Sequence, residues 1–180
     1  MLVLPLIAAL AGEPTAHEWG VQLPLGLGMP TGLIGIALDW TPTPKFTLEG
    51  GLGADRTFSV LGDTGGFQWS FMPRLHLADS GPGLSIGAGI SGGSYEWCDS
   101  CPFENGDRWR WSQAFWFNFE GALEYRWTSG WGLRLLGGGA KLLNPDNVTC
   151  EATRYNCEDV APARQSIQPY FGFVVRVPLW

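Results

Sequence analysis

In the single uninterrupted stretch from Gln113 to Trp127, most of the bulky apolar side chains share one parity, while Asn118, Glu120, Glu124 and Arg126 share the other. These bulky side chains are Phe115, Phe117, Phe119, Leu123, Tyr125 and Trp127. Successive side chains of a β-strand point to opposite faces, so this stretch predicts a strand with one apolar and one polar face. Similar alternation recurs along the chain, with bulky apolar groups on one parity and mostly Gly and Ser on the other. The pattern predicts a β-barrel whose outer surface meets lipid.

Composition leaves few charges for a water-facing surface. Only 16% of the 180 residues are charged, against roughly 25% in soluble domains. No stretch approaches the roughly 18 consecutive apolar residues of a membrane-spanning helix, so crossing a bilayer would require strands closed into a barrel. The net charge is −6 and the 11 Lys and Arg residues are scattered. Because phosphate neutralisation needs clustered basic side chains, this argues against a nucleic-acid partner.

Alternation and turn residues mark eight candidate strands. They span Trp19–Leu27, Gly32–Trp40, Lys45–Ala54, Phe67–Leu77, Gly83–Gly93, Gln113–Trp127, Trp131–Leu142 and Ser166–Leu179. Long loops at about 55–66, 94–112 and 143–165 alternate with short turns. This alternation is typical of outer-membrane barrels with periplasmic termini and extracellular long loops. The expected fold class is all-β: an eight-stranded antiparallel up-and-down transmembrane β-barrel over residues 19–180.

Residues 1–11 are apolar and end in Ala9-Leu10-Ala11, the small-x-small form of an export cleavage site. Because they lack a basic segment at the start, we interpret them as a short or mis-started signal peptide, with a disordered apolar N-terminus as the alternative. Residues 12–18 would then form a periplasmic segment before the barrel.

Nearly all ionisable residues of the candidate strands fall on the polar parity. They are Asp39, Lys45, Glu49, Arg74, His76, Glu120, Glu124, Arg126, Arg134 and Arg176. Lys141 is the exception, and we expect a bulge beside Gly137-Gly138-Gly139 to re-phase it. A charge at the lipid midplane costs about 2–4 kcal/mol, so a bilayer would enforce this segregation.

Six of these residues are expected to form a polar network inside the barrel: Glu49, Arg74, Glu120, Glu124, Arg134 and Arg176. An eight-stranded barrel is only wide enough for its own side chains. Carboxylates and guanidinium groups should therefore pair and plug the lumen, with Glu120 one layer above the others, although a gated ion path is an alternative. Above this charged layer, toward the exterior, the inward positions carry small residues such as Gly53 and Gly138. They have two interpretations: a blind pocket, or the relief of crowding between strands.

Aromatic residues gather at the strand ends that the topology assigns to the periplasmic side. This girdle comprises Trp19, Trp40, Phe46, Trp127, Trp131 and Trp180. Phe67, Trp69 and Phe115 lie near the opposite rim. Aromatic rings prefer the membrane interface, so two girdles at the two headgroup levels are expected.

The four cysteines form two sequence pairs, Cys98 with Cys101 and Cys150 with Cys157. In an exported protein this arrangement predicts disulfides that brace the outer loops, whose connectivity the sequence leaves open. A redox dithiol at Cys98 and Cys101 and a zinc site are the alternatives.

From Trp19 to Trp180 the chain resembles the small eight-stranded outer-membrane barrels of Gram-negative bacteria, through its strand count, loop alternation, girdles and aromatic C-terminus. That family ends in an aromatic residue preceded by apolar residues at every second position. Here the apolar series is Phe171, Phe173, Val175, Val177 and Leu179, one residue out of phase with Trp180. The resemblance implies an outer-membrane location, with membrane lipid, lipopolysaccharide and the outer-membrane assembly machinery as partners, and no cofactor.

The expected role is structural or surface interaction, without catalysis and without bulk transport. One alternative is a lipid-modifying enzyme, because lipid A deacylases and palmitoyltransferases share this architecture and use a His with a Ser near the outer rim. Against it, both histidines, His17 and His76, are expected on the periplasmic side. The other alternative is a soluble ligand-binding β-barrel with its apolar face turned inward.

Overall fold

The computed structural model describes residues 17–54, 66–77, 82–98, 108–127, 129–147, 149–151 and 167–179. The strands are β1 (Glu18–Leu27), β2 (Ile34–Thr43), β3 (Phe46–Ala54), β4 (Phe67–His76), β5 (Gly83–Cys98), β6 (Arg108–Arg126), β7 (Gly132–Leu142), β8 (Thr149–Glu151) and β9 (Ile167–Leu179). Within these ranges, no helix has the length and apolar character needed to cross a membrane.

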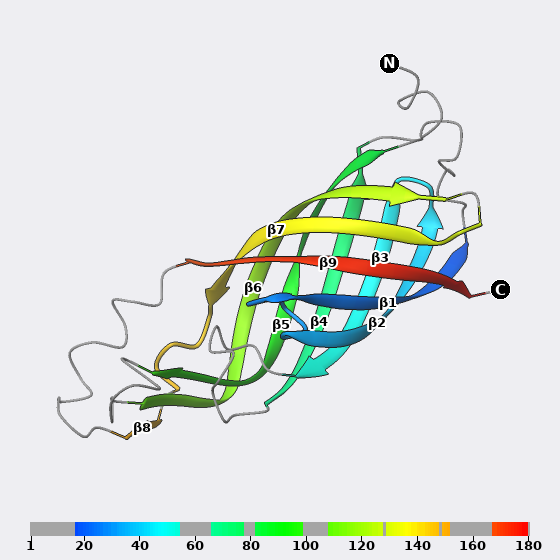
Figure 1. The fold of residues 1–180 in the computed structure, drawn as a ribbon. Helices are drawn as coiled ribbons and strands as arrows, with labels where there is room; N and C mark the ends of the chain where they lie inside the picture. The colour runs from blue at the N-terminus through cyan, green and yellow to red at the C-terminus, as the bar shows by residue number, and fades with distance from the viewer. Residues whose placement is uncertain are drawn as a thin grey trace, which may run out of the picture.

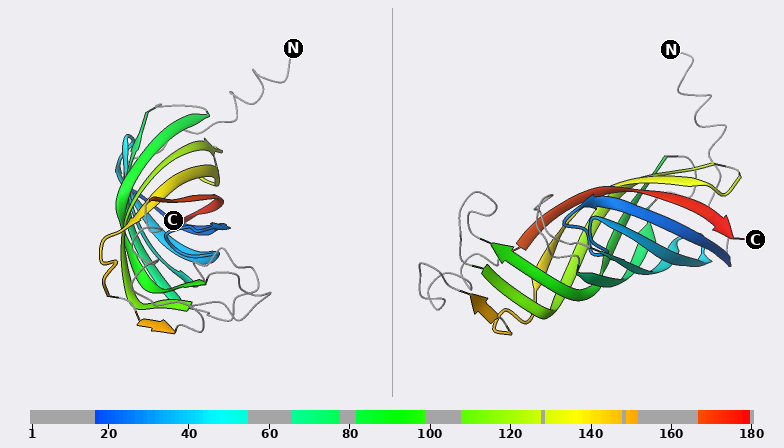
Figure 2. Two further views of the ribbon diagram at one scale, coloured as in Figure 1. Left: turned by 90° about the vertical axis from the view of Figure 1, so that its left-hand side faces the viewer. Right: turned by 60° about the horizontal axis from the view of Figure 1, so that its bottom comes forward.

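Eight of the strands close into an antiparallel up-and-down barrel, which confirms the predicted architecture. Each strand from β1 to β6 pairs with the next, while β9 pairs with both β7 and β1 and completes the ring. The short strand β8 lies outside this ring and pairs with β6 at Arg108–Arg110. Figures 1 and 2 show β8 beside the projecting part of the β5–β6 hairpin.

The two ends of the barrel differ. β1 begins where β9 ends, since Trp19 pairs with Leu179, and we call this the terminal end. The opposite end, which carries β8 (Figure 1), is called the loop end. At the terminal end only residues 44 and 45 separate β2 from β3. Such tight connections hold adjacent strands in antiparallel register.

The β5–β6 hairpin is longer than predicted, because residues 94–98 and 108–112 were assigned to a loop and belong to strands. The register shifts between Gly93 and Tyr95. On β6, Ser112 and Gln113 are both exposed, and Trp111 is buried out of phase with the rest of the strand. An extra residue of this kind is a β-bulge, and it interrupts the strict alternation by which the strand was recognised.

Two other expectations are corrected. β7 pairs with β6 without a register shift, so no bulge re-phases Lys141, which is exposed on the outer face opposite Phe117 and Ile167. β2 begins at Ile34 rather than Gly32 and runs on to Thr43. Gly32 has a φ of 86° and donates its N–H to the carbonyl of Met29 at 2.8 Å, so it belongs to a turn.

Several expectations fall outside the described residues. They are the candidate signal peptide at 1–11, most of the segment at 12–18, Trp180, and most of the loops at 55–66 and 143–165, the latter containing β8.

The barrel is apolar outside, and its buried interior includes polar and charged side chains. The exposed fraction reaches 58% for Ile34, 61% for Leu135 and 57% for Phe171. The alternate positions are buried and include charged groups such as Asp39 and Arg74. Alternation along each strand therefore places the apolar parity outward, the reverse of a water-soluble barrel.

Candidate functional site

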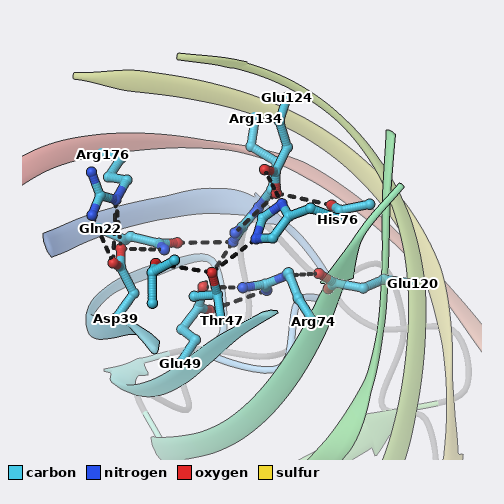
Figure 3. A network of polar contacts seen from close by, with 12 residues as sticks. Gln22, Asp39, Thr47, Glu49, Arg74, His76, Glu120, Glu124, Arg134 and Arg176 are labelled. Atoms are coloured by element: carbon cyan, nitrogen blue, oxygen red, sulfur yellow. Dashed lines mark hydrogen bonds and ion pairs between the residues drawn. The ribbon is translucent and has the colours of Figure 1, made fainter. Parts of the chain in front are cut away.

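The interior toward the terminal end is lined by buried polar and charged side chains. They are Gln22, Asp39, Thr47, Glu49, Arg74, His76, Glu120, Arg134 and Arg176. These residues come from strands around the ring and point toward one another, as Figure 3 shows. Because buried charges are costly unless paired, their partners decide what this network can do.

Arg74 lies between two carboxylates at the centre of the network. Its Nε donates to Glu120 Oε1 at 2.6 Å, and its Nη1 and Nη2 donate to the two oxygens of Glu49. Arg134 Nη2 donates to the same Glu49 Oε2 at 2.9 Å. Forked guanidinium pairs of this kind are both strong and directional. The four side chains therefore span the lumen from β3 and β4 to β6 and β7.

Gly87 allows the Arg74–Glu120 contact to form. It stands between the two residues in the register of β4, β5 and β6. A Cβ at this position would lie 3.1 Å from Arg74 Cγ and 3.1 Å from Glu120 Cγ. This inward glycine therefore relieves crowding beneath a charged pair.

A second cluster surrounds Arg176 at the terminal end. Its Nε and Nη2 each lie 3.0 Å from a carboxylate oxygen of Asp39, and its Nη1 lies 2.7 Å from Glu18 Oε1 and 2.8 Å from the carbonyl of Gly130. Gln22 joins the two clusters, because it donates to Asp39 Oδ2 at 2.6 Å and accepts from Arg134 Nη2 at 2.9 Å. The clusters thus form one connected network.

In a third group, a carboxylate contacts an imidazole, and the imidazole contacts a hydroxyl. His76 Nδ1 lies 3.0 Å from Glu124 Oε2, and His76 Nε2 lies 2.8 Å from Thr47 Oγ1. This order is that of a catalytic triad. However, Thr47 is 1% exposed and its hydroxyl also contacts Thr41 at 3.1 Å. A nucleophile must be reached by its substrate, so the geometry supports a structural link between strands.

All six residues predicted for the lumen lie in the interior and join this network, but their grouping differs from the prediction. Glu120 was expected one layer above the others and instead bonds directly to Arg74. Arg176 pairs with Asp39 and Glu18, outside the central cluster. The network also includes Gln22, Asp39, Thr47, His76 and Ser85, which were not predicted as members. The only feature of the sequence that could have identified these residues as members is their position on the inward parity of their strands.

The interior toward the loop end is filled by aromatic and aliphatic side chains. They belong to a buried cluster that also reaches the polar network, since Val174 pairs with Arg134. The cluster comprises Met29, Tyr95, Trp109, Trp111, Ala114, Trp116, Ala122, Leu136, Ala140, Leu142, Tyr170 and Val174. The ring of Tyr95 lies 5.3 Å from Trp111 and 5.0 Å from Trp116. A Cβ at Gly138 would lie 2.5 Å from Tyr170 Cζ. Of the two readings of the inward glycines, the described residues therefore favour crowding over a blind pocket.

The aromatic residues predicted for the periplasmic girdle lie at the terminal end wherever they are described. Trp19, Trp127 and Trp131 are exposed, and Trp40 and Phe46 are half-buried. The rings of Trp19 and Trp40 stack at 5.9 Å. Toward the loop end, the rings of Trp69 and Phe115 also lie 5.9 Å apart.

The cysteine predictions lie largely outside the described residues. Cys101 and Cys157 fall in undescribed segments, whereas the backbones of Cys98 and Cys150 belong to β5 and β8. Cys98 pairs with Arg108 and Cys150 pairs with Trp109, so their strands flank β6 on opposite sides.

No protein-family model, curated protein or solved structure matches this chain. Among the side chains that the structure describes, no group of three or more His, Cys, Asp or Glu is arranged to hold a metal ion. The functional conclusion therefore depends on the barrel's own surfaces and interior.

Proposed function

We propose that this chain is a small outer-membrane β-barrel with a plugged lumen, which acts in membrane structure or surface interaction and not as a bulk porin. The observation that carries the proposal is the apolar outer surface. Side chains such as Phe71, Leu123 and Phe173 are 45%, 58% and 44% exposed. Many exposed apolar side chains around an interior that buries charged groups are what lipid stabilises and water does not.

Strand length supports the same proposal. Six of the barrel strands, β1 to β4, β7 and β9, have 10, 10, 9, 10, 11 and 13 residues. A tilted transmembrane strand needs about 9–11 residues. β5 and β6 have 16 and 19 residues, and we propose that their excess projects from the membrane with β8.

The terminal end, with its tight β2–β3 turn and exposed tryptophans, would face the periplasm, and the loop end would face the exterior. The projecting hairpin and β8 would then present the surface for a partner. Membrane lipid, lipopolysaccharide and the assembly machinery remain the proposed contacts.

The plug argues against transport. Arg74 and Arg134 join strands across the lumen through Glu49, and the aromatic cluster fills the interior above them. Side chains thus occupy the path that a diffusing solute would need, as an eight-stranded ring predicts.

The alternatives have less support. A soluble ligand-binding barrel would place its apolar side chains inside, whereas Ile36 and Leu52 are 54% and 51% exposed. For a lipid-modifying enzyme, an imidazole should lie at the outer rim. His76 instead bonds to Glu124 and Thr47 toward the terminal end, and the N–H of His17 bonds to the carbonyl of Thr41 at the same end.

Refolding into vesicles tests the proposal. We expect the purified chain to require detergent or lipid, to migrate faster on a gel before boiling than after, and to have its exposed tryptophans quenched by brominated lipid. A chain that stays monomeric in buffer alone and shows no lipid quenching would contradict a membrane location.

A further inference from the structure

A small cavity at the terminal end is lined by three arginines from adjacent strands. Arg126 is the last residue of β6, Arg134 belongs to β7 and Arg176 to β9. Gly132 pairs with both Arg126 and Arg176, and its missing side chain leaves space between them. The polar plug described above does not account for this space.

Two donors in this wall lack acceptors. Arg126 is 9% exposed and Arg134 is 7% exposed. Arg126 Nη1 and Arg134 Nε are buried and have no hydrogen-bond partner among the described residues. A buried donor without an acceptor is unfavourable, particularly on a charged group. These two atoms therefore indicate a missing acceptor.

The cavity lining also includes one carboxylate, that of Glu124, and the carboxylates at this end of the barrel already have partners. The Glu124 oxygens accept from Ser85 at 2.9 Å and lie 3.0 Å from His76 Nδ1. Asp39 and Glu18 pair with Arg176. Within the described part of the chain, the guanidinium of Arg126 forms no ion pair. The wall of the cavity thus carries one positive charge that is not balanced by a contacting carboxylate.

We propose that this cavity binds a single small inorganic anion, of halide size, between Arg126 and Arg134. The cavity volume is about 20 Å³, and one water needs roughly 10–15 Å³ on the same measure. A chloride or bromide ion fits a space of this size. Guanidinium N–H groups are the usual donors to such an anion. The anion would hold the ends of β6 and β7 together beside the plug.

The test uses the folded full chain in detergent. Its thermal unfolding midpoint is measured in sodium chloride and in sodium gluconate at equal ionic strength, because gluconate is much larger than the space between the arginines. An ion that binds only the folded state raises the midpoint with its concentration. We expect the midpoint to be several degrees higher in chloride than in gluconate.

Arg126→Gln should abolish the difference in unfolding midpoint between chloride and gluconate. Lys45→Gln is the matched control, because it removes one positive charge from an exposed residue at the same end of the barrel, and it should leave the difference intact. If Arg126→Gln does not fold, Gly132→Ala replaces it. The added Cβ would meet Arg176 Cβ at 3.4 Å and Arg126 Cγ at 3.5 Å, so it fits while narrowing the cavity, and it should reduce the difference.

Crystals grown in bromide give a direct readout, and we expect an anomalous peak between Arg126 and Arg134. Equal midpoints in the two salts, a difference that persists in Arg126→Gln or Gly132→Ala, or a water without anomalous signal at this position would overturn the proposal.

Discussion

Arg74 and Glu120 come from strands that are not neighbours, yet their side chains meet at 2.6 Å across the backbone of β5. Gly87 stands between them in the register, and a Cβ at this position would crowd both side chains at 3.1 Å. The plug therefore depends on a glycine as much as on its charges.

Gly87→Val should separate Arg74 from Glu120 and leave buried charges unpaired. Breaking a buried ion pair costs about 3–5 kcal/mol, so the free energy of unfolding, measured by denaturant titration, should fall by about that amount. Gly121→Val is the control. A Cβ at Gly121 meets nothing within 4 Å, so this change should be nearly neutral, and equal effects at both positions would refute the argument.

The proposed membrane location predicts that the outer surface tolerates a charged side chain better near the membrane interface than at the midplane. Phe71 is 45% exposed in the middle of β4, and Leu77 is 61% exposed just beyond its end. Arginine on the lipid face costs about 2–4 kcal/mol at the midplane and about 0–1 near the interface. Phe71→Arg should therefore impair refolding into vesicles far more than Leu77→Arg, as scored by gel mobility before boiling. In a barrel surrounded by water, both changes would be tolerated equally.

Planar-bilayer recordings should show no stable open channel for the unmodified protein, because Glu49, Arg74 and Arg134 bridge the lumen. Arg74→Ala combined with Arg134→Ala should increase leakage. Arg110→Ala, which removes an exposed charge on the projecting part of β6, should not. Large steady conductance of the unmodified protein would show that the lumen is not plugged.

The strand register constrains the predicted disulfides. Because Cys98 and Cys150 belong to strands on opposite sides of β6, two strand spacings of about 4.8 Å each separate them. This exceeds the roughly 4.4–6.8 Å between the Cα atoms of a disulfide. Peptide mapping of unreduced protein should find each of these cysteines bonded to Cys101 or Cys157. A Cys98–Cys150 bond, or four free thiols, would contradict the prediction.

Residue-by-residue alternation predicted the barrel strands and their two faces, because an extended chain turns successive side chains in opposite directions. It also placed Glu49, Arg74 and Arg134 inside. The same rule failed where the backbone departs from it, at the bulge beside Ser112 and Gln113 and at the turn around Gly32. The expectation for Lys141 was wrong for the opposite reason. A bulge was expected to turn this lysine inward, but the strand is regular and the lysine is exposed on the outer face.

By itself, the sequence determined which side chains of the regular strands share a face, because that depends only on local geometry along each strand. The closed ring decided which of them meet. Arg176 on β9 pairs with Asp39 on β2, and Arg134 on β7 reaches Glu49 on β3. Such contacts cross the lumen between residues far apart in the chain. They depend on strand register, on barrel closure and on the glycines that open space between side chains, which no local pattern encodes.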